Sequence, residues 1–128
     1  MKNSNLSYTR QQLLDNTKKR YNSYNRAVNN NEECLYITEN NNRCAIGIEL
    51  TPNTCHKLNQ VKPTLEGGTS VRNKEIFNTL PKRLQDMGED FLSDIQSLHD
   101  CGWYWNSEGL TQDGLSKVNQ IKAIYNLN

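Results

Sequence analysis

The spacing of apolar residues near the start of the chain predicts a helix. Between Thr9 and Val28, apolar side chains recur at steps of three and four residues, which places them on one helical face. Thr9 and Gln12 have the spacing of a capping box, so we expect the helix to begin there. The asparagine run at 29–31 is expected to end it. The predicted buried face consists of Leu13, Leu14, Thr17, Tyr21, Tyr24 and Val28.

In the next segment, the spacing of side chains changes from a helical period to an alternation at every second residue. Leu35 and Ile37 alternate with Tyr36 and Thr38, which predicts a strand. Residues 39–43 are typical of a turn. Residues 44–48 are then either the return strand of a hairpin or the first turn of a helix, because so short a run does not separate the two periods. Gly47 either adopts an unusual backbone angle or allows another group to approach closely.

Helical periodicity returns in the second half of the chain. Residues 51–70 are mostly loop, with a short helix expected at 53–58. Pro81 suits a first helical turn, Gly88 is expected to kink or break the helix, and Gly102 is expected to end it. A last helix is expected to start near Thr111. The apolar positions that support these two helices are Leu84, Met87, Phe91, Ile95 and Leu98, then Leu110, Leu115, Val118, Ile121 and Tyr125.

These elements predict one domain over residues 1–128, of the α+β class but mostly α. We expect about three main helices with a small β-hairpin. Hydrophobic residues make up only 34% of the chain, so the core is expected to be thin. A thin core favours completion by a second subunit, and we therefore expect a homo-oligomer.

Charge and cysteine content narrow the functional classes. The net charge of +1 argues against binding of a nucleic-acid polymer, which needs a strongly basic surface. Neither a secretory signal nor an apolar run of membrane-spanning length is present, so a cytoplasmic protein without membrane contact is expected. The four cysteines should be reduced thiols, and their spacing fits no zinc pattern. We expect no metal and no cofactor.

The chain gathers its largest rings and a His-Asp pair between Phe91 and Asn106. His99 falls at the edge of the apolar stripe, where it is either a structural histidine bonded to backbone or a ligand-binding group in a cleft. Asp100 is the next residue, so on a helix it should point about 100° away. A catalytic pair between the two is not expected. A nucleophile made of Cys44 or Cys55 with His99 has no local support, and no catalytic residue is predicted.

A binding role suits the tryptophans and two arginines better. Trp103 and Trp105 would share one face of an extended segment, because side chains alternate along a strand. An exposed indole is a stacking platform for a base. Arg43 and Arg72 are the expected phosphate or carboxylate partners, since the guanidinium fork fits either group. The predicted ligand-binding residues are Arg43, Arg72, His99, Trp103 and Trp105.

Three segments give the chain a resemblance to a known family. "YTRQQLLD", "CLYITENNNRCAIG" and "FLSDIQSLHD" followed by tryptophan occur in this order, with "LEGGTSV" between the last two. They resemble a family of small, largely uncharacterised phage and bacterial proteins with RCAIG and FLxDLQxxHD motifs. The likeness spans about residues 7–105. It departs from the usual pattern at Asn41-Asn42, which replace an Asp-Gly type pair in the turn.

The resemblance implies a phage accessory protein rather than a particular reaction. Some proteins of this class bind a nucleotide-derived immune signal, such as a cyclic ADP-ribose isomer or a cyclic dinucleotide, and sequester it without cleavage. Two alternatives remain at this point. The first is an enzyme that hydrolyses such a nucleotide with His99. The second is an inhibitor that binds a host protein through Trp103 and Trp105.

Overall fold

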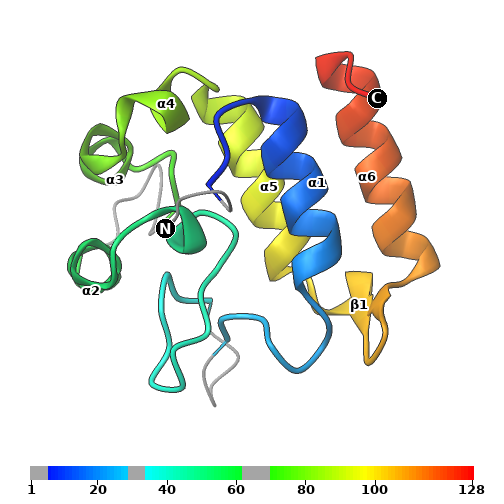
Figure 1. Cartoon of the computed structure of the whole chain (residues 1–128), viewed down its shortest axis with the longest axis horizontal. Helices are drawn as coiled ribbons and strands as arrows, with labels where there is room; N and C mark the ends of the chain where they lie inside the picture. Colours follow the sequence, from blue (N-terminus) through cyan, green and yellow to red (C-terminus); the bar gives the residue numbers. More distant parts are fainter. Residues whose placement is uncertain (1–5, 29–33, 62–69) are drawn as a thin grey trace.

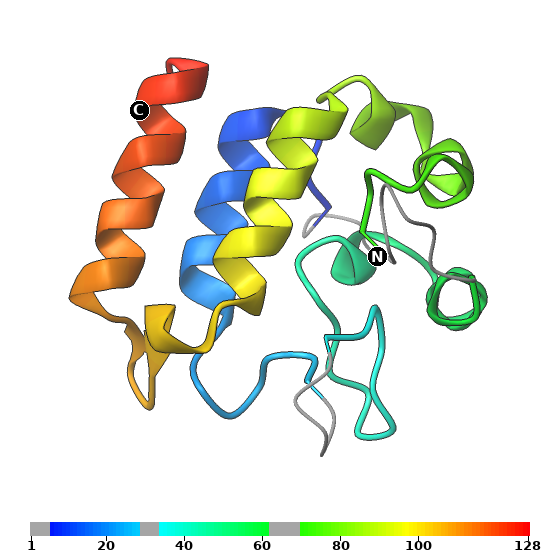
Figure 2. The same cartoon turned by 180° about the vertical axis from the view of Figure 1, so that it is seen from behind.

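The structure is a computed structural model that describes residues 6–28, 34–61 and 70–128. Three helices form one side of the molecule: α1 (Arg10–Arg20), α5 (Glu89–Asp100) and α6 (Gln112–Tyr125). They run side by side in both views, and α5 contacts α1 as well as α6 (Figures 1 and 2). The shorter helices α2 (Pro52–Asn59), α3 (Lys74–Thr79) and α4 (Lys82–Gln85) lie on the other side of α5. The predicted α+β class with mostly helix is confirmed.

The first helix begins where the capping box predicts. The Thr9 hydroxyl accepts from the Gln12 backbone, and the Gln12 side chain accepts from the Thr9 backbone. It ends at Arg20, however, well before Val28. Beyond it, the Asn22 and Asn25 side chains accept from backbone N–H groups within the segment. These local bonds hold the chain in turns and compete with the helix, so the predicted continuation to Val28 is wrong.

The second long helix is interrupted as Gly88 suggested. Gly88 has a φ of 94°, which favours glycine, and it separates α4 from α5. Pro81 lies at the N-cap of α4, one residue before the helix proper. The last helix begins after Thr111, whose hydroxyl accepts from the Gly114 backbone. The short helix expected at 53–58 is confirmed as α2.

The small hairpin is not where the alternation of Leu35 and Ile37 placed it. The paired strands are β1 (Trp105–Asn106) and β2 (Gly109–Leu110). The earlier segment makes only isolated bridges, between Val28 and Cys34 and between Ile37 and Arg43. Residues 44–48 are not a return strand either, because a 3-10 turn, η1, covers Gly47–Glu49.

The core lies between α1, α5 and the segments on the far side of α5. Phe91, Leu92, Ile95 and Leu98 on α5 are fully buried, and so are Leu13 and Leu14 on α1. Side chains from the loops and short helices complete this core, including Ile46, Leu58 and Ile76. α5 is thus packed on more than one side, which fixes its position in the molecule. Among the described residues, no helix is both long and apolar enough to cross a membrane.

Candidate functional site

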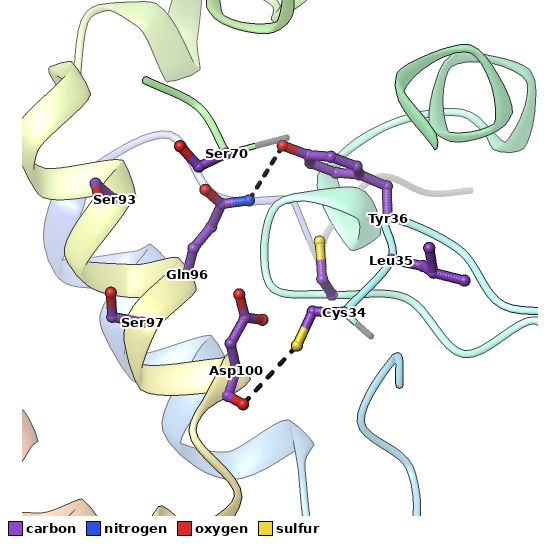
Figure 3. Close-up of a pocket in the computed structure, with 9 residues that line it drawn as sticks. Cys34, Leu35, Tyr36, Ser70, Ser93, Gln96, Ser97 and Asp100 are labelled. Carbon is purple, nitrogen blue, oxygen red and sulfur yellow. Dashed lines mark hydrogen bonds between the residues drawn. The ribbon is translucent and has the colours of Figure 1, made fainter. Parts of the chain in front are cut away.

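A polar pocket of about 130 Å³ opens between α5 and the loop segments beside it. Four of its lining residues follow one another at helical steps along a single face of α5 (Figure 3). The opposite wall comes from the segment at Cys34 and from the end of the loop before α3. The lining residues are Cys34, Leu35, Tyr36, Cys44, Ser70, Ser93, Gln96, Ser97 and Asp100.

Gln96 on α5 forms hydrogen bonds to two other segments that surround this pocket. Its carbonyl oxygen accepts from the Val71 backbone at 3.0 Å, and its amide nitrogen donates to the Tyr36 hydroxyl at 3.2 Å. The dashed line in Figure 3 marks the second bond. Both ends of the amide are therefore used, which holds the Tyr36 ring against α5. The segments from Cys34 to Gly47 and from Phe91 to Asp100 meet at this point.

His99 is fully buried beneath the pocket and belongs to the framework. Its Nε2 lies 3.2 Å from the backbone N–H of Ala27, which can only donate. Nε2 must therefore accept, so the imidazole is neutral and carries its proton on Nδ1. Nδ1 lies 2.6 Å from Oδ1 of Asp100 and donates to it. The expectation that Asp100 points away from His99 is wrong, because the carboxylate turns back past the helix end.

The thiols on the opposite wall are protonated groups. Burial, and to a smaller extent the nearby Asp100 carboxylate, raise the pKa of Cys34 to about 12. Burial also raises the pKa of Cys44 well above its usual range, against a smaller opposing effect of the Gly47 backbone N–H. Neither sulfur is a thiolate at neutral pH, so the pocket wall offers no activated cysteine nucleophile.

A second cavity, of about 290 Å³, lies on the other side of the same segment. Arg43 lines this cavity, whereas the next residue, Cys44, lines the polar pocket. Tyr21 fixes Arg43 by donating to its carbonyl oxygen at 2.8 Å, and Arg43 Nη1 donates to the Leu50 carbonyl oxygen at 3.1 Å. We call this hollow the arginine cavity; its lining residues are Arg20, Tyr21, Asn25, Asn41, Asn42, Arg43 and Ile48.

The charges beside the arginine cavity are unequal. Glu49 is a buried carboxylate that pairs with Arg83 at 2.7 Å and with Arg20 at 3.6 Å. Ser7 donates to the same carboxylate from its backbone and its hydroxyl. Arg20 and Arg43 line the cavity, whereas Glu49 and Arg83 are not among its lining residues. The two lining guanidinium groups attract an anion to the cavity, although Glu49 offsets part of the charge of Arg20.

The structure separates the five residues that the sequence predicted as ligand contacts. Of these, only Arg43 lines either of the two cavities. Arg72 lies at the start of α5, where it pairs with Asp90 at 2.9 Å and with Glu89 at 3.7 Å. His99 is buried beneath the polar pocket, as the structural alternative for it stated.

The two tryptophans do not share a face, so that prediction is wrong. Gly102–Tyr104 forms a 3-10 turn, η2, instead of the expected extended segment. Trp105 is only 4% exposed and donates its indole N–H to the Leu98 carbonyl oxygen at 2.8 Å. Trp103 is 70% exposed and contacts the ring of Tyr104 edge to face. Trp105 therefore completes the core, and Trp103 lies on the surface.

The sequence interpretation missed most of the polar pocket. Ser93, Gln96, Ser97 and Asp100 have the i, i+3, i+4, i+7 spacing of one helix face, and none of them was among the predicted ligand contacts. Arg20, which lines the arginine cavity, was not among them either. A signal was present in "FLSDIQSLHD", where small hydroxyl and amide side chains replace the charged residues usual on an exposed helix face.

Comparison with known proteins does not add a relative from which a role could be transferred. Arguments about function therefore rest on the geometry of the two cavities. No protein-family model, no curated protein and no solved structure matches this chain.

Proposed function

We propose that this protein binds a small nucleotide-derived anion and sequesters it without cleavage. The observation that carries the proposal is the arginine cavity, where the guanidinium groups of Arg20 and Arg43 line about 290 Å³ of space. The family resemblance adds a setting, a phage counter-defence protein in the host cytoplasm. The ligand would then be an immune signal such as a cyclic ADP-ribose isomer or a cyclic dinucleotide.

The cavity has donors suited to phosphate. Arg43 uses one guanidinium nitrogen for the Leu50 carbonyl oxygen, and its planar fork offers further N–H groups. Arg20 adds a second guanidinium, held in place by its ion pair with Glu49. The Asn41 and Asn42 amides lie beside them and can bond a ribose or a base. Charge-assisted bonds from guanidinium to phosphate are among the stronger contacts in proteins, so such a ligand gains affinity here.

Retention of an intact ligand agrees with the chemistry of the neighbouring groups. Burial keeps the Cys34 and Cys44 thiols protonated at neutral pH, which argues against a cysteine nucleophile. His99 is fully buried, and both of its ring nitrogens already have partners. The alternative of a hydrolase that uses His99 would therefore require the histidine to leave these bonds.

Titration calorimetry with ADP-ribose and with a cyclic dinucleotide tests the proposal. We expect Arg43→Gln to weaken binding about 10- to 100-fold, the usual range for a lost charge-assisted bond. Arg72→Gln is the matched control and should leave affinity unchanged, because Arg72 lies outside both cavities. Equal affinity in wild type and Arg43→Gln would rule out this cavity as the binding site.

The fate of the ligand separates sequestration from hydrolysis. After binding, heat denaturation should release a nucleotide of unchanged mass, whereas a hydrolase would release a product. Native mass spectrometry of the same sample reports the bound mass together with the number of subunits. It thereby also tests the expected homo-oligomer.

The exposed indole of Trp103 favours a second candidate, an inhibitor that binds a host protein. Trp103 is 70% exposed, and tryptophan is enriched among residues that dominate binding energy at protein interfaces. This candidate predicts a stable complex with a host protein that Trp103→Ala abolishes, and no affinity for nucleotides. Nucleotide binding that is unaffected by Trp103→Ala would favour the arginine cavity instead.

A further inference from the structure

The polar pocket in Figure 3 has a chemistry opposite to that of the arginine cavity. Its lining residues include the Asp100 carboxylate, three serine hydroxyls and two protonated thiols, and none of the described lining residues has a cationic side chain. We propose that this pocket is a second binding site, for a small neutral sugar whose hydroxyl groups donate to Asp100 and exchange hydrogen bonds with the serines. The inference is independent of nucleotide binding at Arg43.

The bond from His99 determines which ligand atoms Asp100 can meet. Because Nδ1 of His99 carries its proton, Oδ1 of Asp100 accepts from it at 2.6 Å, and the carboxylate remains a pure acceptor. An ionised carboxylate has about four acceptor positions, of which His99 takes one; the Cys34 thiol donates instead to the backbone carbonyl oxygen of Asp100, at 3.8 Å. The remaining positions require O–H or N–H donors. A phosphate or carboxylate ligand would be repelled.

The positive charge of Arg26 makes the polar pocket more suitable for a neutral hydrogen-bond donor than for a cationic ligand. Its Nη1 lies 3.2 Å from the carbonyl oxygens of both His99 and Asp100, at the end of α5. Arg26 lowers and Asp100 raises the pKa of Cys34 in the pocket wall, so the two charges partly offset each other there. A ligand cation would meet this partly offset charge and would still lose its hydration. A hydroxyl group has a much smaller desolvation cost and still forms a charge-assisted bond.

The size and spacing of the pocket fit a five-membered sugar ring. A volume of about 130 Å³ has room for one small ring with its hydroxyl groups and is too small for a whole nucleotide. Ser93 and Ser97 stand one helical turn apart, so their hydroxyls reach different edges of a ring. Each hydroxyl donates as well as accepts, as a sugar hydroxyl does. Tyr36, held by Gln96, provides an aromatic wall beside them.

Protein NMR titration with methyl β-D-ribofuranoside tests the inference directly. We expect saturable shifts of the α5 amides, and several-fold weaker binding of the 2-deoxy analogue, which lacks one donor. Asp100→Asn should weaken sugar binding about tenfold, because a neutral acceptor replaces a charged one. Asp86→Asn is the matched control: Asp86 is an exposed aspartate paired with Lys82, and affinity should not change.

A second variant covers the case in which Asp100→Asn does not fold. Ser97→Leu leaves the His99–Asp100 bond intact, keeps helix propensity and fills the pocket mouth, so it should abolish the sugar-induced shifts. Arg43→Gln should leave them unchanged, which separates this inference from the nucleotide proposal. Absence of saturable shifts in wild type, sugar binding unaffected by both pocket variants, or tighter binding of ethanolamine than of the sugar would each overturn it.

Discussion

The backbone N–H of Ala27 donates to Nε2 of His99 at 3.2 Å, and this contact joins the segment after α1 to the end of α5. Replacing His99 by phenylalanine keeps a ring of similar size but removes the acceptor. A buried N–H without a partner costs about 1–3 kcal/mol. We therefore expect His99→Phe to lower the free energy of unfolding by about that amount in urea denaturation.

The control for this substitution is His56→Phe, because His56 is exposed on α2. It should change the free energy of unfolding by less than about 0.5 kcal/mol. Nitrogen NMR of wild type should also show the proton of the buried imidazole on Nδ1. A proton on Nε2 would contradict the assigned tautomer.

The two tryptophans should differ sharply in their effect on stability. Trp105 is buried and bonded to Leu98, so Trp105→Ala should lower the free energy of unfolding by about 3–5 kcal/mol. Trp103 is mostly exposed, so Trp103→Ala should change it by less than about 0.5 kcal/mol. Chemical denaturation measures both. Iodide should quench the fluorescence of Trp103 and leave that of Trp105 largely intact.

Gly47 is required because the chain passes very close to it. A Cβ at this position would collide with the carbonyl oxygen of Tyr36, which belongs to the backbone and cannot swing away. Gly47→Ala should therefore destabilise the protein by several kcal/mol, about the upper end of usual single substitutions. At Gly102, a Cβ would meet only the far end of Arg26 at 3.5 Å. Equal thermal stability of Gly47→Ala and Gly102→Ala would contradict this packing.

Glu49 should be the most sensitive carboxylate among the described residues. Its side chain is fully buried, and Arg83 and Arg20 would keep their charges if it were neutralised. Breaking a buried pair in this way costs about 3–5 kcal/mol, so Glu49→Gln should lower the free energy of unfolding by that amount. Glu75→Gln, on the exposed face of α3, is the control. Urea denaturation compares the two variants.

Stability should fall at alkaline pH because of the buried thiols. The pKa of Cys34 rises from 9.0 to about 12 in the folded protein, and that of Cys44 rises as well. Between these values the unfolded chain loses protons that the folded chain retains, so the free energy of unfolding decreases as pH rises. The contribution is complete below pH 9 and is lost toward pH 12. Thermal melts between pH 7 and 11 should show a smaller decline for Cys34→Ser than for wild type.

Period and capping signals predicted the long helices because those signals are local. Thr9 and Gln12 close the first turn of α1, and Thr111 begins α6, through bonds between residues close in sequence. The chain after Arg20 was less predictable, since its asparagines bond their own backbone instead of following the helical period. The alternation of Leu35 and Ile37 was misleading for a different reason. The Asn59 side chain bonds the backbone of Tyr36 and Ile37, taking the place of a partner strand.

The candidate site was hardest to predict because it depends on contacts between distant segments. Arg43, predicted as a phosphate or carboxylate partner, lines the arginine cavity, but the charge of that cavity also depends on Arg20 and its pairing with Glu49, which only the fold brings together. A similar limit applies to the tryptophans. Alternation assumes an extended chain, and the 3-10 turn at Gly102–Tyr104 rotates Trp103 away from Trp105.

Two sides of α5 have different roles: one packs in the core, and the other lines the polar pocket. Its apolar side chains, such as Phe91 and Ile95, are buried in the core, while Ser93 and Ser97 on another side line the polar pocket. Exchanges at these serines need not disturb the core residues. During evolution, descendants of this chain could therefore acquire new ligand preferences while keeping the same architecture.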